Sequence, residues 1–330
     1  SEMCIRDRFY EASSFNEDIS QWNVSNVTDM YWMFRETSFN QDISQWNVSK
    51  VTTMRSMFYK TSSFNQPLNN WNVSNVTDMR WIFYESSFNQ PLNNWNVSNV
   101  TNMRSMFYAS SFNQPLNNWN VSNVTNMYYM FSLASSFNQD ISQWNVSNVT
   151  NMSNMFNEAS SFNQDIRNWD VDPSVDFTNM FDGASNMINN YSAPVTPDAF
   201  WFVPPYQPTN RYHLENAISQ LLIDRFLGNT DSLSQYGYIS SWDTSLITDM
   251  SYLFNFDMYQ NYQDFEIYLL DHPFNENISN WNVSNVTNMS YMFFGASSFN
   301  QDISQWNVSK VTSICLLYTS DAADDRGCVD

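Results

Sequence analysis

The side chains that could carry out catalysis are few and lie far apart along the chain. Histidine occurs only as His213 and His272, so no nucleophile, base and orienting partner can be assigned. Neighbouring carboxylates such as Glu17 and Asp18 recur too loosely for the paired acids of a glycosidase. The sequence has no phosphate-binding glycine loop and no metal-ligand motif. We therefore expect no catalytic residue, no metal site and no cofactor, and we predict that the chain is not an enzyme.

The balance of charges argues against a nucleic-acid partner. The 330 residues include 13 Lys and Arg against 33 Asp and Glu, which gives a formal net charge of −20. Binding to a phosphate backbone requires clustered cations. The negative charge serves either solubility or a diffuse surface for cations.

No apolar run approaches the roughly 18 residues of a membrane span. Because the chain opens at Ser1 within a repeat, we expect the true N-terminus to lie upstream, and the lack of a signal segment says little.

The remaining candidates for binding are uncharged polar residues that flank a series of tryptophans. Gln or Asn precedes each Trp, Asn follows it, and Ser comes two residues later. Alternate side chains of a strand share one face, so we expect rows of polar groups there. These rows are either a solvated face or a platform for protein or glycan ligands. The candidate binding residues are Gln21, Asn23, Ser25, Gln45, Asn47, Ser49, Asn70, Asn72, Ser74, Asn94, Asn96, Ser98, Asn118, Asn120, Ser122, Gln143, Asn145 and Ser147.

Tandem repeats must position these rows. Tryptophan recurs every 24 or 25 residues, and such a fixed period indicates units that stack on one another. A single unit cannot bury its own apolar edge, so stability depends on contacts between neighbours. The tryptophans that define the period are Trp22, Trp46, Trp71, Trp95, Trp119, Trp144 and Trp169, followed further along by Trp281 and Trp306.

Within each repeat the apolar spacing predicts a strand and then a helix. Ile141, Trp144 and Val146 follow the spacing of a leucine-rich repeat and alternate with polar residues as in a half-buried strand. Residues 149–156 place Val, Met, Met and Phe on one helical face, where methionine packs into the core, and Thr150 is a plausible N-cap. We predict an α/β fold, a leucine-rich-repeat-like right-handed solenoid. It has one short parallel strand and one short helix per 24–25-residue repeat, arranged in two arrays.

The first array is predicted over residues 9–182 and comprises about seven repeats. Residues 183–210 follow with a density of prolines that blocks helices and strand ladders. This segment is either a linker or an ordered cap in which Phe200, Trp201 and Phe202 cover the open end of the first array.

The second array is predicted over residues 211–313. It opens with an amphipathic helix over residues 212–227 that ends at Gly228. This helix is expected to cap the array, and a strand is expected at residues 239–244. The repeat spacing then lengthens, which indicates an insertion near residues 255–271.

Both ends of the chain abandon the repeat. Residues 1–8 and 314–330 resemble translated sequencing adapter and are expected to be non-native flanks. They contain every cysteine, namely Cys4, Cys315 and Cys328, so a disulfide framework is excluded for the repeats.

The recurring asparagines of the repeat could have two further roles, as glycosylation acceptors and as a hydrogen-bonded ladder. Asn-Val-Ser and Asn-Val-Thr, as at Asn72 and Asn75, are formally glycosylation acceptors, or they arise from repeat composition alone. Val27 and Val149 fill the place where leucine-rich repeats carry a buried Asn ladder. The Asn that follows Phe is therefore predicted to form a ladder instead, at Asn16, Asn40, Asn65, Asn138 and Asn163.

The recurring pattern W-N-V-S-N-V-T-x-M-x-x-M-F-x-x-A-S-S-F-N-Q resembles the BspA-family leucine-rich repeat surface proteins, including mycoplasma-type lipoprotein repeats known as a domain of unknown function. The resemblance covers residues 9–182 and 211–313, and residues 236–244 are similar to the opening of an array in that family. It implies an extracellular or cell-surface protein for adhesion or protein binding, without catalysis. A protein or glycan ligand is thus expected. The alternatives are a purely architectural surface spacer or a glycan-binding solenoid.

Overall fold

The computed structural model describes residues 9, 12–255, 274–315 and 317, and the structural statements that follow concern that part of the chain. The chain divides into two compact units, residues 1–202 and residues 203–330. Each unit is described by itself.

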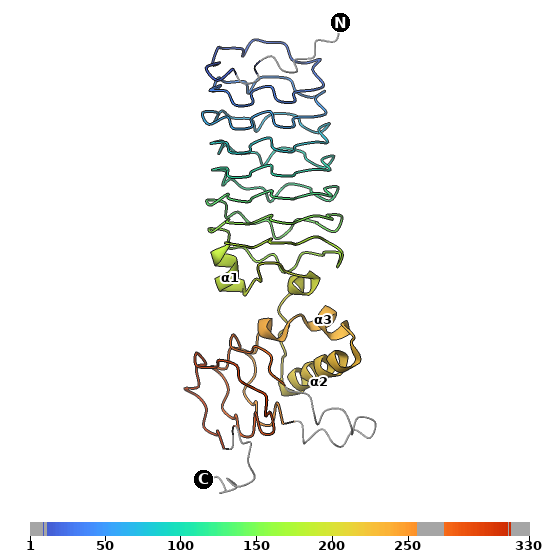
Figure 1. Cartoon of the computed structure of the whole chain (residues 1–330), viewed down its shortest axis with the longest axis vertical. Helices are drawn as coiled ribbons and strands as arrows, with labels where there is room; N and C mark the ends of the chain where they lie inside the picture. The colour runs from blue at the N-terminus through green and yellow to red at the C-terminus, as the bar shows by residue number, and fades with distance from the viewer. Residues whose placement is uncertain (1–8, 10–11, 256–273, 316, 318–330) are drawn as a thin grey trace. The chain divides into compact units, whose positions relative to one another are not determined.

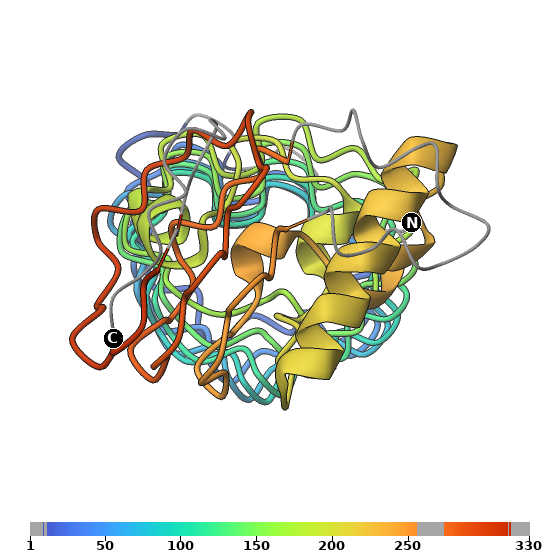
Figure 2. The same ribbon diagram turned by 90° about the horizontal axis from the view of Figure 1, so that it is seen from below.

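In the first unit every repeat forms one coil, and successive coils lie on one another (Figure 1). Viewed along the stack, the coils of this unit overlie each other around a common interior (Figure 2). One isolated parallel bridge joins each coil to the next, so the predicted stacking of the repeats is confirmed. The bridges pair Asp29 with Thr53, Thr53 with Asp78, Asp78 with Asn102, Asn102 with Asn126, Asn126 with Asn151, and Asn151 with Asp176.

Beside each bridge, alternate N–H groups donate to carbonyls of the following coil. Met30 donates to Thr53 at 3.1 Å, and Phe34 donates to Met57 at 2.9 Å. Intervening N–H groups close turns within the coil, as where Met33 donates to the carbonyl of Met30. The backbone is thus paired both within and between coils, which a buried backbone requires.

The predicted α/β fold, with one strand and one helix in every repeat, is wrong. None of the described repeats contains an α-helix, and their only ladder pairings are isolated bridges. The bridge residue Asn151 lies within the segment 149–156 that was predicted to be helical. The predicted strand around Trp144 instead contains a turn, in which the N–H of Trp144 donates to the carbonyl of Ile141 at 3.1 Å.

The apolar spacing predicted a helix that is absent, because one left-handed residue interrupts the segment and a second follows it. Asn154 has a φ of 56° and Glu158 a φ of 58°, and equivalent residues in the other coils are also left-handed. A residue in this conformation cannot continue a right-handed helix. A two-turn helix is also costly to nucleate, whereas each interior coil has a neighbour on either side to complete its ladder. The spacing of Met152 and Met155 reports which side chains face the interior, and not the path of the backbone.

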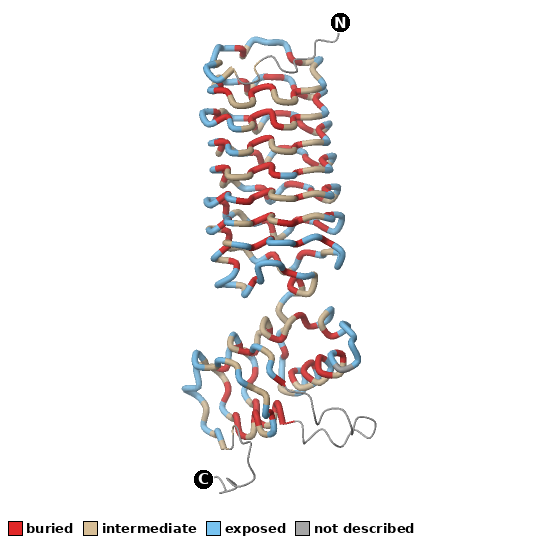
Figure 3. Tube along the Cα trace, in the orientation of Figure 1, coloured by how far each residue is buried: buried red, intermediate tan, exposed pale blue. Residues whose placement is uncertain are grey.

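Columns of methionine and phenylalanine fill that interior, and buried residues alternate with exposed ones along each coil (Figure 3). The rings of Phe34 and Phe58 lie 5.6 Å apart, and Phe58 lies 5.7 Å from Phe83. A second column runs beside the first, with Phe34 stacked on Phe39 at 4.0 Å. Full burial of each such side chain contributes about 1.5–3 kcal/mol. The prediction that the methionines belong to the core is confirmed.

Indole groups join the coils where a backbone ladder had been expected. The Nε1 of Trp95 donates to the carbonyl of Leu68 at 2.8 Å, and that of Trp119 donates to Leu92 at 3.0 Å. The same bond recurs at Trp46, Trp71, Trp144 and Trp169. Each of these tryptophans is buried, so its polar atom needs a partner.

The first unit ends in an ordered cap. It comprises α1 (Ser185–Tyr191) and the 3₁₀ helix η1 (Ala199–Phe202). Phe202 stacks on Trp169 at 6.3 Å, and Trp201 lies 5.1 Å from Phe181. Trp201 and Phe202 are buried, while Phe200 is half-buried. The part of this segment up to Phe202 therefore packs on the end of the first unit, whereas residues 203–210 belong to the second unit.

The second unit opens with α2 (Arg211–Leu227), then α3 (Asp231–Tyr236) and the 3₁₀ helix η2 (Ile239–Ser241). The predicted helix is confirmed: Asn210 caps its N-terminus by accepting a bond from the N–H of His213, and Gly228 ends it with a φ of 71°. The strand predicted at residues 239–244 is wrong, because η2 occupies its first half.

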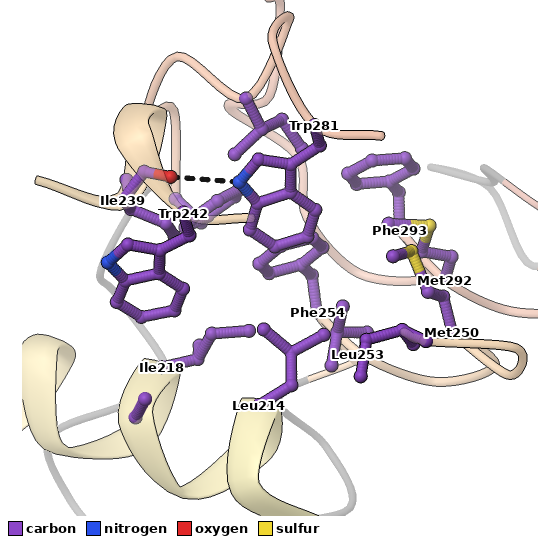
Figure 4. Close-up of a cluster of buried hydrophobic side chains, with 14 of the residues drawn as sticks. Leu214, Ile218, Ile239, Trp242, Met250, Leu253, Phe254, Trp281, Met292 and Phe293 are labelled. Carbon is purple, nitrogen blue, oxygen red and sulfur yellow. Dashed lines mark hydrogen bonds between the residues drawn. The ribbon is translucent and has the colours of Figure 1, made fainter. Parts of the chain in front are cut away.

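Three coils follow, joined by bridges from Asp249 to Asn288 and from Asn288 to Ser313. Leu214 and Ile218 of α2 pack into their core beside Leu253 and Phe254 (Figure 4). The helix thus covers apolar side chains of the coils, as expected of a cap. The insertion predicted near residues 255–271 lies outside the described residues except for Asn255. Ser313, Cys315 and Leu317 lie against the preceding coil: the N–H of Tyr291 donates to the carbonyl of Cys315 at 2.9 Å.

Candidate functional site

The polar rows predicted from the sequence do lie on the surface. Trp119 and Val121 point inward while their polar neighbours point outward. Those exposed are Gln21, Asn23, Gln45, Asn47, Asn70, Asn72, Asn94, Asn96, Asn118, Asn120, Gln143, Asn145 and Ser147, and those half-buried are Ser25, Ser49, Ser74, Ser98 and Ser122.

Much of the hydrogen-bonding capacity of these rows is used within the fold. The Oδ1 of Asn72 accepts a bond from the N–H of Ser74 at 3.1 Å, and Asn96 and Asn120 do the same for the serine two residues later. Such local bonds hold a turn. The nearby Asn75, which is outside these rows, donates from its side-chain amide to the carbonyl of Ser49 on the preceding coil at 2.7 Å. The asparagines of the polar rows therefore hold turns within their own coils, while neighbouring asparagines join the coils. The same bonds recur in successive coils, so the rows present a repeated surface.

The asparagines that follow phenylalanine form the predicted ladder. The N–H of Asn163 donates to Oδ1 of Asn138 at 2.8 Å, and the N–H of Asn138 donates to Asn113 at 3.0 Å. Gln164 adds a bond from its amide to the Oδ1 of Asn138 at 2.8 Å. The same ladder links Asn16, Asn40, Asn65, Asn89 and Asn113.

Side chains that differ between repeats gather elsewhere, on the segments that carry the inter-coil ladder. Four positions of each such segment lie beside the buried Met and Phe residues, and in the first five described ladder segments they hold mostly Tyr, Trp and Arg. We name the surface formed by their large side chains the aromatic–arginine face. It comprises Tyr31, Trp32, Arg35, Arg55, Tyr59, Lys60, Arg80, Trp81, Tyr84, Arg104, Tyr108, Tyr128 and Tyr129.

One column of this face is a run of stacked tyrosines. The rings of Tyr59 and Tyr84 lie 4.5 Å apart with an interplanar angle of 7°, and Tyr84 lies 4.5 Å from Tyr108 at 5°. Arg35 extends the column, with its guanidinium carbon 4.8 Å from the centre of Tyr59. Rings stacked in this way present their edges and hydroxyls outward, because their faces cover each other.

A second column alternates arginine with aromatic rings. Arg55 lies 5.0 Å from the centre of Tyr31 and 4.7 Å from that of Trp81. Arg104 lies 5.2 Å from the centre of Trp81 on the preceding coil and 4.8 Å from that of Tyr128 on the following coil. A guanidinium over an aromatic ring is attracted by the ring quadrupole, by about 0.5–1 kcal/mol at exposed sites. These contacts hold both arginines in one orientation.

Ion pairs fix most of the other charged groups of the face. Lys60 pairs with Glu85 at 3.4 Å, and this carboxylate raises the pKa of Lys60. Arg80 pairs with Asp78 at 2.6 Å. Burial, with the neighbouring Tyr108 and Glu85 adding to it, raises the pKa of the Tyr84 hydroxyl well above its ordinary value. The tyrosine therefore stays a neutral donor at physiological pH.

The sequence reasoning missed this face because the side chains were assigned to a helix. The signal that could have found it is variation between copies of the repeat. The segment Trp-Asn-Val-Ser-Asn-Val-Thr is almost unvarying, whereas the positions after each Met change from Tyr31 to Arg55 and Arg80, and to Ser153 in a later coil. Variable aromatic and charged positions on an unvarying scaffold are typical of a recognition surface.

Stacked coils joined by ladders, with caps built from separate segments, define a tandem-repeat solenoid protein. A family model described as Mycoplasma protein of unknown function, DUF285, matches residues 3–92, 79–193 and 224–323. The chain belongs to this family. The finer assignment to BspA-family leucine-rich repeat proteins is not confirmed. No curated protein and no solved structure matches the chain. Among the described residues, no helix has the length and apolar character needed to cross a bilayer.

Proposed function

We propose that the chain is a protein-interaction module that binds its partner through the aromatic–arginine face and catalyses no reaction. The observation that carries this proposal is that tyrosine, tryptophan and arginine replace one another on this face, while the segment Trp-Asn-Val-Ser-Asn-Val-Thr of the same repeats is almost unvarying. These three residue types dominate the energetically important positions of protein interfaces.

The rigidity of the face supports the same function. The stacked tyrosines and ring-held arginines are already ordered by contacts within the chain. Binding through ordered side chains loses less conformational entropy than binding through free ones. A large, ordered and amphipathic surface can therefore bind without first being reorganised.

An extracellular or cell-surface location and a role in adhesion are part of the proposal and rest on the resemblance in the repeat pattern. The alternative of a glycan ligand is favoured by the many exposed amides of the polar rows. Sugars commonly pack on open ring faces, and the Tyr59, Tyr84 and Tyr108 rings cover one another. We therefore place a glycan, if one binds, on the polar rows.

A parallel screen tests the proposal. The full chain is screened against a displayed library of random peptides and against a glycan array. The screen is repeated with the triple variant Tyr59→Ser, Tyr84→Ser and Tyr108→Ser, which introduces the residue that position 132 carries. The matched control is Asn70→Ala with Asn94→Ala on the polar rows.

We expect peptide ligands that bind the chain and the control but are lost from the tyrosine variant. Glycan ligands lost only from the asparagine variant would support the glycan alternative instead. If the chain yields no ligand of either kind, it is better described as an architectural spacer. Urea unfolding of each variant shows whether it keeps its fold.

A further inference from the structure

The most distinctive part of the aromatic–arginine face is the order Tyr31, Arg55, Trp81, Arg104, Tyr128. Each guanidinium is sandwiched between two rings, at 5.0 and 4.7 Å for Arg55 and at 5.2 and 4.8 Å for Arg104. The two rings belong to the coils before and after each arginine. A guanidinium carries its N–H donors in its own plane, so a ring stacked on its face does not use them.

These two arginines are not neutralised by the chain. The face carries five cations, and three of them form ion pairs, namely Arg35 with Glu36, Lys60 with Glu85, and Arg80 with Asp78. Within the described part of the chain, Arg55 and Arg104 contact no carboxylate, although 33 of the 330 residues are acidic. The Nε of Arg55 is buried, so a ligand can reach this guanidinium only through its terminal Nη groups. Arg104 is exposed.

We propose that this face binds an acidic segment of a partner protein, with one carboxylate on Arg55 and a second on Arg104. The inference rests on the proposed function and names the chemistry of the partner. A carboxylate is a planar acceptor that a fixed guanidinium edge binds through two parallel hydrogen bonds. The neighbouring tyrosines supply apolar area and hydroxyl donors to the rest of the segment.

The spacing of the arginines suits an extended peptide. They lie two coils apart, which corresponds to about 10 Å if each coil adds the usual separation of neighbouring strands. A segment in the polyproline II conformation advances about 3.1 Å per residue with three residues per turn. Two acidic residues at positions i and i+3 of such a segment lie on one side about 9 Å apart, which matches the two guanidinium groups.

A uniformly charged polyanion suits this face less well. Nucleic acids and sulfated polysaccharides bind to clusters of unpaired cations, but here only two cations lack a carboxylate. Such a polymer would also meet Glu36, Asp78 and Glu85 on the same face. A peptide can place neutral residues opposite these carboxylates.

Fluorescence anisotropy with labelled twelve-residue peptides tests the inference. The first peptide carries two glutamates three positions apart among alanine and tyrosine, and the second replaces both glutamates with glutamine. Heparin serves as the polyanion probe. The protein variants are Arg55→Gln with Arg104→Gln. The matched control is Lys50→Asn with Lys310→Asn, which also removes two positive charges and introduces the residue that Asn26 and Asn285 provide in other coils.

We expect the glutamate peptide to bind the chain and the lysine control about tenfold more tightly than the glutamine peptide does, a ratio typical of one charged contact. The arginine variant should bind both peptides equally weakly. Equal binding of the two peptides to the wild-type chain, or equal loss in the lysine control, would overturn the inference. Heparin that competes more strongly than the glutamate peptide, and loses its effect in the arginine variant, would also overturn it in favour of a polyanion.

The failure of this inference differs from the failure of the proposed function. If library peptides are lost from the tyrosine variant but keep their affinity for the arginine variant, the face binds proteins without reading carboxylates. If they keep their affinity for both variants, the aromatic–arginine face is not the binding surface.

Discussion

The guanidinium carbon of Arg55 lies 4.7 Å from the centre of the Trp81 ring on the next coil. Trp81 also receives Arg104 from its other side, at 5.2 Å. One indole thus links side chains of three successive coils. This contact both stabilises the stack of coils and forms part of its exposed surface. Changes at Trp81 should therefore alter stability and binding together.

Replacing this indole should destabilise the first unit. Trp81→Leu removes three cation–π contacts, with Arg55, Arg80 and Arg104. At about 0.5–1 kcal/mol each, we expect the free energy of unfolding to fall by at least about 1 kcal/mol. A double-mutant cycle with Arg104→Met, followed by urea unfolding, isolates the pair. A coupling energy indistinguishable from zero would show that the ring does not hold Arg104.

The indole ladder should contribute measurably to stability. Trp119→Phe keeps a ring in the core but removes the 3.0 Å bond to the carbonyl of Leu92, which still accepts from the N–H of Trp95. A hydrogen bond of this kind contributes about 0.5–1.5 kcal/mol. Urea unfolding should show a loss of that size. The control is Trp22→Phe, because Trp22 is 41% exposed and begins the ladder. Equal losses in the two variants would contradict the role of the bond.

The Asn ladder should respond to loss of its acceptor. Asn138→Ala removes the oxygen that accepts bonds from the N–H of Asn163 and the amide of Gln164, both at 2.8 Å. We expect a loss of about 0.5–1.5 kcal/mol, measured by urea unfolding. Asn138→Asp keeps an acceptor and should lose less. A neutral alanine variant would refute the structural role of the ladder.

Glycine should stabilise the coils at the left-handed positions. Ala109 has a φ of 49°, and Gly183 and Gly295 fill the equivalent place in other coils. Ala109→Gly relieves backbone strain, and we expect a net gain of about 0.5–1 kcal/mol. Thermal unfolding should show a higher midpoint. The control, Ala134→Gly, lies at a fully buried residue outside the left-handed region and should be destabilising. A lower midpoint for Ala109→Gly would count against strain.

Stability should fall in acid. Side-chain hydrogen bonds from Arg167, at 2.9 and 2.8 Å, hold the pKa of Asp165 below its ordinary value. Because the folded-state pKa is the lower one, the stabilisation is complete above the unfolded pKa of about 3.9 and is lost as the pH drops through the folded value. Urea unfolding from pH 6 to pH 3 should therefore show a decline that is smaller in Asp165→Asn. Parallel curves for the two proteins would exclude this contribution.

The sequence alone determined the repeat, its period, the identity of the core and the helix that opens the second unit. These features depend on local signals. Trp and Met at fixed intervals must be buried whatever path the backbone takes. The ends of α2 depend only on residues next to the helix, namely Asn210 before it and Gly228 after it. The Asn ladder also followed from the recurrence of one polar residue at one position.

Only the tertiary structure decided the path of the backbone within each coil. Residues 149–156 have the apolar spacing of a helix, but each coil pairs its alternate N–H groups with the next coil, and left-handed residues such as Asn154 make this possible. The partners lie a whole repeat apart in sequence, so no local pattern reports them. For the same reason the contact between Arg55 and Trp81, and with it the aromatic–arginine face, emerged only once the coils were stacked.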